Sequence, residues 1–243
     1  MSHSLEHLPE FEELLADYHV SDEAREVLQD VTMVATPGPS GSGRSSMIEG
    51  LLETGHYERI VSTTTRPPRE NDGVMEQNGV HYWFVSEEEM LEKLRNGDML
   101  EAELIHGIQV SGISMEELRK AREHGKVAIT EMDFGIDRVH EANPNVIILF
   151  VAPHDHETHM QRFKGRGNMS EAEFEKRLGT VQKMYETALD HPYYKIIINE
   201  HLPETIQTAR RIIEEGKYTE EEHESGLTVV RGLLDRITEM RNQ

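Results

Sequence analysis

The stretch Gly38-Pro39-Ser40-Gly41-Ser42-Gly43-Arg44-Ser45, residues 38–45, follows the apolar run 31–36 and precedes a helical pattern. A strand, a glycine-rich turn and a helix in this order form the usual context of a phosphate-binding loop. Glycines let the backbone turn its amide N–H groups toward phosphate oxygens, and the helix N-terminus adds positive potential. The stretch therefore predicts a nucleoside triphosphate site, with residues 38–46 as its contacts.

The basic residue of this loop is an arginine, Arg44, where the strict pattern has a lysine. Ser45 follows it, and a hydroxyl at this position holds Mg²⁺. Two other interpretations of the loop stay open. A dinucleotide-binding loop would require a third glycine where Ser46 stands, and a plain Gly/Ser turn would only connect a strand to a helix.

Composition limits the class of protein. A chain of 243 residues without an obvious linker predicts one compact domain with subdomains or insertions. The absence of cysteine excludes disulfides and cysteine-ligated zinc or iron–sulfur sites. The longest apolar stretch, 146–153, is too short to span a membrane, and the N-terminus lacks a signal-peptide pattern. We expect a soluble, cytoplasmic protein that is a monomer or a homodimer.

The formal net charge of −21 argues against binding to DNA or RNA, which requires clustered Lys and Arg. An acidic protein that binds nucleotides has to place its few cations where the phosphates lie, so the position of each arginine is informative. A high-salt habitat is a second explanation of the acidity.

The order of apolar and amphipathic segments predicts the fold class. Short apolar strands separated by helices indicate an α/β protein, with a parallel sheet flanked by helices. Two stretches interrupt this pattern: residues 63–113 predict an inserted small mixed sheet, and residues 154–192 predict a polar helical segment. The expected strands are 31–36, 60–62, 127–132, 146–152 and 195–199.

The two ends of the chain are expected to be helical. In the acidic extension 1–30, Phe11, Leu14, Leu15 and Tyr18 follow a helical spacing, and Ser21 caps a second helix. We expect this extension to pack on the core or to be partly disordered; a binding element is the alternative. A C-terminal helix is expected within 216–243. Capping boxes are predicted at Ser86/Glu89, Ser114/Glu117, Ser170/Glu173 and Thr219/Glu222.

A second motif strengthens the nucleotide hypothesis. In Ser62-Thr63-Thr64-Thr65-Arg66-Pro67-Pro68-Arg69, two arginines three residues apart surround a proline turn directly after an expected strand. The planar guanidinium suits bidentate contact with phosphate. The alternative is an exposed basic turn, which is unusual in a chain with so few cations.

With these two motifs, the chain resembles the guanylate kinase family, which transfers a phosphoryl group from ATP to GMP. The resemblance covers about residues 31–215 and also includes H-Y-x-F-V, L-E-x-E-x-x-x-G, Glu-x-Asp, R-x-x-G-R-G and I-x-N-E, in the family's order. It implies a P-loop NTPase fold in which 63–113 is the acceptor-nucleotide subdomain and 154–192 is a lid.

The resemblance also implies roles for individual residues. The acceptor nucleotide would be bound by a set drawn from the inserted sheet and one strand end: Ser62, Arg66, Arg69, Tyr82, Glu101, Ser111 and Asp133. Within this set, Glu101 and Asp133 would accept hydrogen bonds from guanine, because ionised carboxylates are pure acceptors.

The catalytic cations implied by the resemblance are Arg44 in the loop and three lid arginines, Arg162, Arg166 and Arg177. The i, i+4 spacing places Arg162 and Arg166 on one helix face. ATP and Mg²⁺ would be required, with Ser45 and, through water, Glu131 near the metal. Phosphoryl transfer depends on such positioning and positive charge.

Three departures from the family pattern stand out. Arginine is larger and forked, so Arg44 predicts retained binding with a slower chemical step, by about 1–4 kcal/mol. The segment 107–114 is one residue longer than the family's loop; Ser111 replaces an expected tyrosine and Ile113 replaces a hydroxyl residue. Asp133-Phe134-Gly135 is one residue shorter than the family's run.

Other functions remain as alternatives. A kinase of the same fold that acts on another nucleotide or a sugar phosphate is one, and a catalytically weak or inactive interaction module is another. The run His154-Asp155-His156-Glu157-Thr158-His159 either begins a solvated helix or binds a metal, for which fixed ligand spacing is lacking.

Overall fold

A computed structural model describes residues 4–71, 73–165 and 170–242. The chain divides into two compact units. The first unit contains residues up to 33, 57–130 and 134–146, and the second contains 34–56, 131–133 and 147 onward. Each is described in turn below.

Four of the five strands predicted to be parallel are present, and the fifth strand of the sheet lies just before its predicted position. The five strands are β1 (Met33–Thr36), β2 (Tyr57–Arg59), β9 (Val127–Glu131), β10 (Ile147–Pro153) and β11 (Tyr194–Asn199), in the order β11-β10-β1-β9-β2. The strand expected at 60–62 was wrong, because the regular pairing with β9 occupies β2 instead. Beyond β2, the N–H of Ile60 continues this pairing, at 2.9 Å from Ile129 O.

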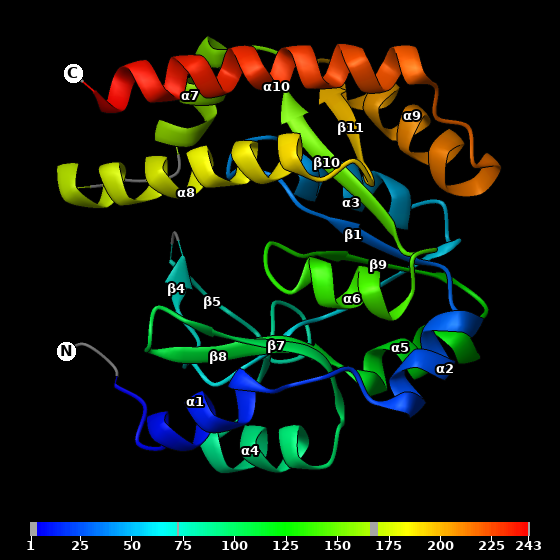
Figure 1. The fold of residues 1–243 in the computed structure, drawn as a ribbon, viewed down its shortest axis with the longest axis vertical. Coiled ribbons are helices and arrows are strands. Elements are labelled where there is room, and N and C mark those ends of the chain that lie inside the picture. Colours follow the sequence, from blue (N-terminus) through cyan, green and yellow to red (C-terminus); the bar gives the residue numbers. More distant parts are fainter. Residues whose placement is uncertain (1–3, 72, 166–169, 243) are drawn as a thin grey trace. The chain divides into compact units, whose positions relative to one another are not determined.

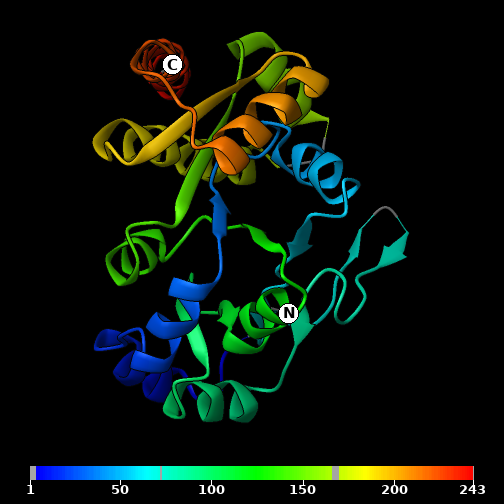
Figure 2. The same ribbon diagram turned by 90° about the vertical axis from the view of Figure 1, so that its right-hand side faces the viewer.

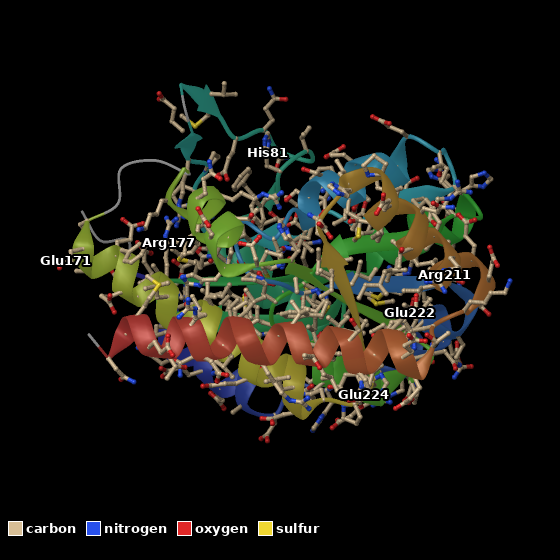
Figure 3. The ribbon with its side chains drawn as sticks, turned by 90° about the horizontal axis from the view of Figure 1, so that it is seen from above. His81, Glu171, Arg177, Arg211, Glu222 and Glu224 are labelled. Carbon is tan, nitrogen blue, oxygen red and sulfur yellow. The ribbon has the colours of Figure 1, made fainter. Side chains whose placement is uncertain are left out.

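Five helices among the described residues belong to the second unit. They are α3 (Arg44–Leu52), α7 (His156–Lys164), α8 (Glu171–Asp190), α9 (Leu202–Glu215) and α10 (Glu220–Arg241). The last helix packs along α8 and against β11 (Figure 1), and α3 packs against α9. Arg211 on α9 donates to Glu222 on α10 (Figure 3). No helix among the described residues has both the length and the apolar character needed to cross a bilayer.

The first unit contains the predicted mixed sheet. Its order is β6 (Trp83–Phe84), β3 (Thr63–Thr64), β8 (Gln109–Ser114) and β7 (Met99–Ile105), with β3 parallel to β6 and antiparallel to β8. A hairpin of β4 (Glu70–Asn71) and β5 (Val74–Met75) projects from this unit (Figure 2). Its helices in the central part of the chain are α4 (Glu87–Arg95), α5 (Met115–Glu123) and α6 (Ile136–Ala142).

The N-terminal extension is part of the core of the first unit, as one of the two sequence hypotheses predicted. It forms α1 (Leu8–Ala16) and α2 (Asp22–Asp30). Phe11 and Leu15 are buried in a cluster with residues of α4 and β7. Tyr18 lies beyond the end of α1 and donates its hydroxyl to Met99 O at 2.6 Å. Burial raises the pKa of Tyr18 to about 12.

All four residues predicted to start helices are N-caps, and three of them make a side-chain cap hydrogen bond. Ser86, Ser170 and Thr219 accept from the backbone N–H three residues on, and Thr219 with Glu222 forms a full capping box. Ser114 is the N-cap of α5, but the capping box predicted with Glu117 was wrong, because the Ser114 side chain makes no cap hydrogen bond. Glu117 is turned inward and accepts from Val61 N at 2.8 Å and Trp83 Nε1 at 3.1 Å.

Candidate active site

The phosphate loop, residues 38–45, leads from the end of β1 into α3 in the second unit. Gly41 and Gly43 both have a φ of +88°, which residues with a side chain rarely adopt. A Cβ at Gly41 would lie 3.2 Å from the backbone nitrogen of Phe163, and one at Gly43 would overlap the side-chain amide of Asn199. Glycine is therefore required at both positions, as in loops that bind phosphate through their backbone.

Side chains outside the loop hold its carbonyl groups. Asn199, at the end of β11, donates from Nδ2 to Ser42 O at 2.7 Å and accepts from Thr205 Oγ1 at 3.0 Å. The Oγ of Ser42 is buried and has no hydrogen-bond partner among the described residues. Because buried polar groups are normally paired, this hydroxyl fits a site shaped for phosphate oxygens.

Arg44, the first residue of α3, is turned toward two carboxylates. Both of its terminal nitrogens donate to Asp133, and its Nε lies 3.1 Å from Oε2 of Glu131. Burial lowers the pKa of Arg44, but Asp133 and then Glu131 outweigh it and raise this pKa above its ordinary value. The sequence assigned these residues to phosphate, guanine and metal, whereas the structure joins all three in one ion-pair cluster.

Two of the three arginines predicted to belong to a lid are described, and they differ in their surroundings. Nη1 of Arg162 lies 3.8 Å from the position of a Cβ at Gly43, so this guanidinium is beside the phosphate loop. Arg177, on α8 (Figure 3), instead pairs with Glu173, one turn earlier on the same helix, at 2.6 Å. Arg166 lies outside the described residues and α7 ends at Lys164, so the helical face predicted for Arg162 and Arg166 is not part of the described structure.

The run 154–159, considered as a metal site, begins α7. Asp155 is its N-cap and accepts from Thr158 N at 2.8 Å and Thr158 Oγ1 at 2.9 Å. His159 is fully buried rather than solvated, and its Nε2 lies 2.9 Å from Ser40 O. Within the described ranges, no three His, Cys, Asp or Glu side chains are placed to hold a metal ion. The helix start is therefore confirmed, with one of its histidines directed to the loop.

Six of the residues predicted to bind the acceptor belong to the first unit, on or beside the strands of the mixed sheet, and we term this predicted set the acceptor cluster: Ser62, Arg66, Arg69, Tyr82, Glu101 and Ser111. Arg66 is its buried cation and donates to Glu76 from two nitrogens, at 2.5 and 2.8 Å. Its guanidinium carbon lies 4.6 Å from the centroid of the Tyr82 ring. The hydrogen bonding from Arg66 lowers the pKa of Glu76 to about 2. The Arg66 guanidinium is thus oriented and paired within the protein.

Glu101, on β7, is the buried carboxyl of the acceptor cluster. Burial, followed by the nearby charge of Glu103, raises the pKa of Glu101 to about 8. Arg138 opposes this shift, and its Nη1 lies 3.0 Å from Oε1 of Glu103. Glu101 is therefore mostly protonated near neutral pH in this structure.

The remaining members of the acceptor cluster are less buried. Ser111 Oγ lies 2.7 Å from Thr64 Oγ1, across the pairing of β3 and β8. Ser62 accepts through its carbonyl from Trp83 N at 2.9 Å. The side chain of Arg69 is exposed, while its backbone N–H donates to Glu76 at 2.8 Å.

Sequence reasoning missed three residues that hold these sites. Glu76 orients Arg66, Glu117 supports the backbone before β3, and Asn199 fixes the phosphate loop. Glu117 was assigned to a helix cap because its spacing matched that motif. No local pattern distinguishes a buried carboxylate from an exposed one, so only its unusual tertiary partners reveal its role.

Comparison with known proteins identifies the family to which most of the chain is similar. A sequence model of guanylate kinase matches residues 30–216. The chain belongs to the guanylate kinase family. Guanylate kinase from Rhodococcus jostii (strain RHA1) is 34% identical over 191 residues, covering 77% of this chain and 88% of that protein. Guanylate kinase from Helicobacter pylori (strain J99 / ATCC 700824) is 34% identical over 177 residues, covering 71% and 82%.

A solved structure shows the same guanylate kinase fold. The crystal structure of guanylate kinase from Anaplasma phagocytophilum has a TM-score of 0.57 and 23% identity, covering 78% of this chain and 87% of that one. The guanylate kinase family consists of ATP-dependent nucleoside monophosphate kinases, so the predicted family, fold and enzyme class are confirmed. Most of the N-terminal extension and all of α10 lie outside the matched region.

Proposed function

We propose that this protein transfers the γ-phosphoryl group of ATP to GMP or dGMP. An oxygen of the acceptor phosphate forms a bond to the γ-phosphorus, and the bond to the β–γ bridging oxygen breaks, which releases ADP and GDP. The observation that carries the proposal is the phosphate loop, with its left-handed Gly41 and Gly43 at the start of α3, in a chain of this family.

The triphosphate would be held by the backbone of residues 38–46. The buried Ser42 hydroxyl and the guanidinium of Arg162 beside the loop support this assignment. Arg166 and Arg177 would approach from the lid; for Arg177 this requires release from Glu173. Cations that arrive on closure stabilise the transferring group and limit ATP hydrolysis.

Magnesium would be held at the phosphate loop by hard oxygen donors, the kind it prefers. The chain offers the Ser45 hydroxyl and, through water, the Glu131 carboxylate. When bound, the ion would neutralise charge on the β- and γ-phosphates. Glu131 would then exchange its contact with Arg44 for the hydration shell of the metal.

The acceptor would be held by Ser62, Arg66, Arg69, Tyr82 and Ser111, and guanine would be recognised by Glu101 and Asp133. Guanine presents N1–H and an exocyclic amine, which pair with ionised carboxylates. Asp133 is engaged by Arg44 in this structure, and Glu101 must lose its proton. Binding of GMP is therefore coupled to the opening of one ion pair and to one ionisation.

The chemical step is proposed to be slow because of Arg44. Arginine keeps the positive charge, but its fork cannot place a compact charge where an ammonium would lie. The structure adds a second reason, since the three donating nitrogens of Arg44 already contact Asp133 and Glu131. These contacts compete with the phosphates of ATP for the same side chain.

A second candidate function is phosphorylation of another acceptor, a different nucleotide or a sugar phosphate. It is favoured by the altered loop 107–114, in which Ser111 faces Thr64 and Ile113 is buried. Ser111 lacks the aromatic ring of the tyrosine expected at its position, and Ile113 lacks the hydroxyl expected at its position. An inactive interaction module is disfavoured, because the loop glycines, Ser45 and Arg162 are all in place.

A coupled assay of ADP release tests the proposal, with ATP·Mg²⁺ and a panel of GMP, dGMP, AMP, UMP and sugar phosphates. The expected result is saturable turnover with GMP and dGMP above every other acceptor. Rapid turnover of a different acceptor while GMP is inert would replace the guanine assignment. If ATP binds but no acceptor on the panel gives ADP release, the interaction module would be favoured.

A further inference from the structure

A buried pair of side chains contacts the phosphate loop from the lid helices. His159 of α7 and Tyr185 of α8 are both fully buried. The Nε2 of His159 lies 2.9 Å from Ser40 O, and its Nδ1 lies 3.0 Å from the hydroxyl of Tyr185. The three groups form a chain that runs from α8 through α7 to the loop, entirely within the second unit.

The chemistry of the partners sets the tautomer of His159. A carbonyl oxygen only accepts hydrogen bonds, so Nε2 carries the proton and donates to Ser40. Nδ1 is then the acceptor, and the Tyr185 hydroxyl is its donor. Burial lowers the pKa of His159 to about 4, a shift that the Ser40 carbonyl only partly opposes. The ring is thus neutral near pH 7, with both nitrogens paired.

The contact with Ser40 determines the direction of an amide in the phosphate loop. The peptide bond is planar and trans, so the N–H of Gly41 points opposite to the carbonyl of Ser40. When His159 holds that carbonyl on the α7 side, the Gly41 N–H is turned away from α7. Gly41 also packs closely on α7, where a Cβ would lie 3.2 Å from Phe163 N and 3.4 Å from Arg162 Cβ.

We propose that His159, oriented by Tyr185, is a positioning residue that fixes the Ser40–Gly41 peptide so that the Gly41 N–H faces the phosphates of the bound nucleotide. The proposal rests on the proposed function in taking that nucleotide to be ATP or ADP. It gives α7 and α8 a role in binding that does not depend on the lid arginines.

The test compares variants that differ in the donor to Ser40. His159→Leu removes the donor and keeps an apolar side chain, His159→Gln retains an N–H, and Tyr185→Phe removes the donor to Nδ1. Val230→Ala, on α10, is the control for loss of stability alone, because Val230 is fully buried and belongs to none of the proposed sites. The readouts are the Kd for ADP·Mg²⁺ by calorimetry, the KM values for ATP and GMP, and the melting temperature.

We expect His159→Leu to raise the Kd for ADP and the KM for ATP by about 10-fold, the effect of losing one aligned hydrogen bond. The KM for GMP should change by less than about 2-fold, since the proposed acceptor cluster is in the other unit. His159→Gln should recover most of the affinity, and Tyr185→Phe should fall between. Nitrogen-15 shifts of the wild-type imidazole should show the proton on Nε2.

Several results would overturn the proposal. One is a folded His159→Leu protein whose Kd for ADP is within about 2-fold of the wild type. A second is an equal loss of affinity in Val230→Ala at the same melting temperature, and a third is a proton on Nδ1. If the wild type binds ADP but does not phosphorylate GMP, the proposed function fails while the ADP data still decide the role of His159. A wild type that binds no ADP would refute both.

Discussion

Arg44 in the phosphate loop and Asp133, two residues beyond the end of β9, form a two-pronged ion pair, in which Nη1 donates to Oδ1 and Nη2 donates to Oδ2. The proposed roles of these residues lie at opposite ends of the reaction, on the phosphates of ATP and on the base of GMP. Each can serve its ligand only when the pair opens. The pair therefore links the two binding events through the free energy needed to separate two partly buried charges.

Replacing Arg44 with lysine is expected to raise kcat by about 10-fold or more, because one well-placed charge contributes a few kcal/mol to transition-state stabilisation. Lysine cannot make the two-pronged contact with Asp133, so its ammonium is also freer to reach the phosphates. The measurement is ADP release with ATP and GMP. Arg231→Lys, on the exposed surface of α10, makes the same chemical change as a control. A lysine variant no faster than the parent would show that Arg44 is not a handicap.

The KM for GMP is expected to fall as the pH rises from about 6 to about 9, because guanine needs the ionised form of Glu101. Burial and the charge of Glu103 raise the pKa of Glu101 to about 8. In Glu101→Gln the KM should be higher and this pH dependence should be absent. In Glu103→Gln the midpoint should move to lower pH, since one negative neighbour is removed. A pH profile unchanged in both variants would exclude Glu101 as the base-reading carboxylate.

The same ionisation affects stability in a defined direction. A folded-state pKa raised above the ordinary value of 4.5 favours the protonated form of Glu101. Its contribution to stability is present below pH 4.5 and is lost as the pH rises through about 8. Relative to the wild type, Glu101→Gln should therefore gain melting temperature in alkaline buffer.

Removing the charge of Glu76 is expected to destabilise the protein by about 3 kcal/mol at neutral pH, because Arg66 would be left as a buried cation. Both side chains are 8% exposed. The pKa of Glu76 is lowered from 4.5 to about 2, so its contribution is present above pH 4.5 and is lost as the pH falls toward 2. Urea unfolding of Glu76→Gln against wild type should show the difference shrinking in that range.

The exposed Glu70 of the adjacent hairpin provides the matched control for Glu76. Glu70→Gln should change the free energy of unfolding by less than about 0.5 kcal/mol. Equal effects of the two substitutions would mean that the pair with Arg66 contributes little to the fold.

The N-terminal extension is expected to be required for stability. Phe11 is completely buried in the cluster with α4 and β7. Phe11→Ala should lower the free energy of unfolding by about 3–5 kcal/mol, through lost burial and the cavity left behind. Glu12→Ala, at the exposed neighbouring position, should have little effect. A Phe11→Ala protein as stable as the wild type would show that the extension is dispensable.

Much of the fold follows from local patterns in the chain. Continuous apolar runs predicted most of the parallel strands, and serine or threonine with glutamate three residues later predicted four helix starts. The failures share a cause. Tertiary partners decide whether residues 60–62 pair as a strand and whether the Ser114 side chain makes a cap hydrogen bond, and local sequence does not reveal these partners. Glu117 matched a local motif, but Val61 and Trp83 from distant parts of the chain supplied stronger partners.

What the sequence determined by itself is the chemistry of the loop: glycines that permit a left-handed backbone, a hydroxyl at Ser45 and a cation at Arg44. These depend on covalent geometry and spacing within a few residues. Only the tertiary structure decided that Arg44 pairs with Asp133, that Arg66 pairs with Glu76, and that His159 is buried against Ser40. Charge and hydrogen bonding act through space, and burial removes the water that would otherwise compete for each partner, so contacts between distant segments decide which groups are paired.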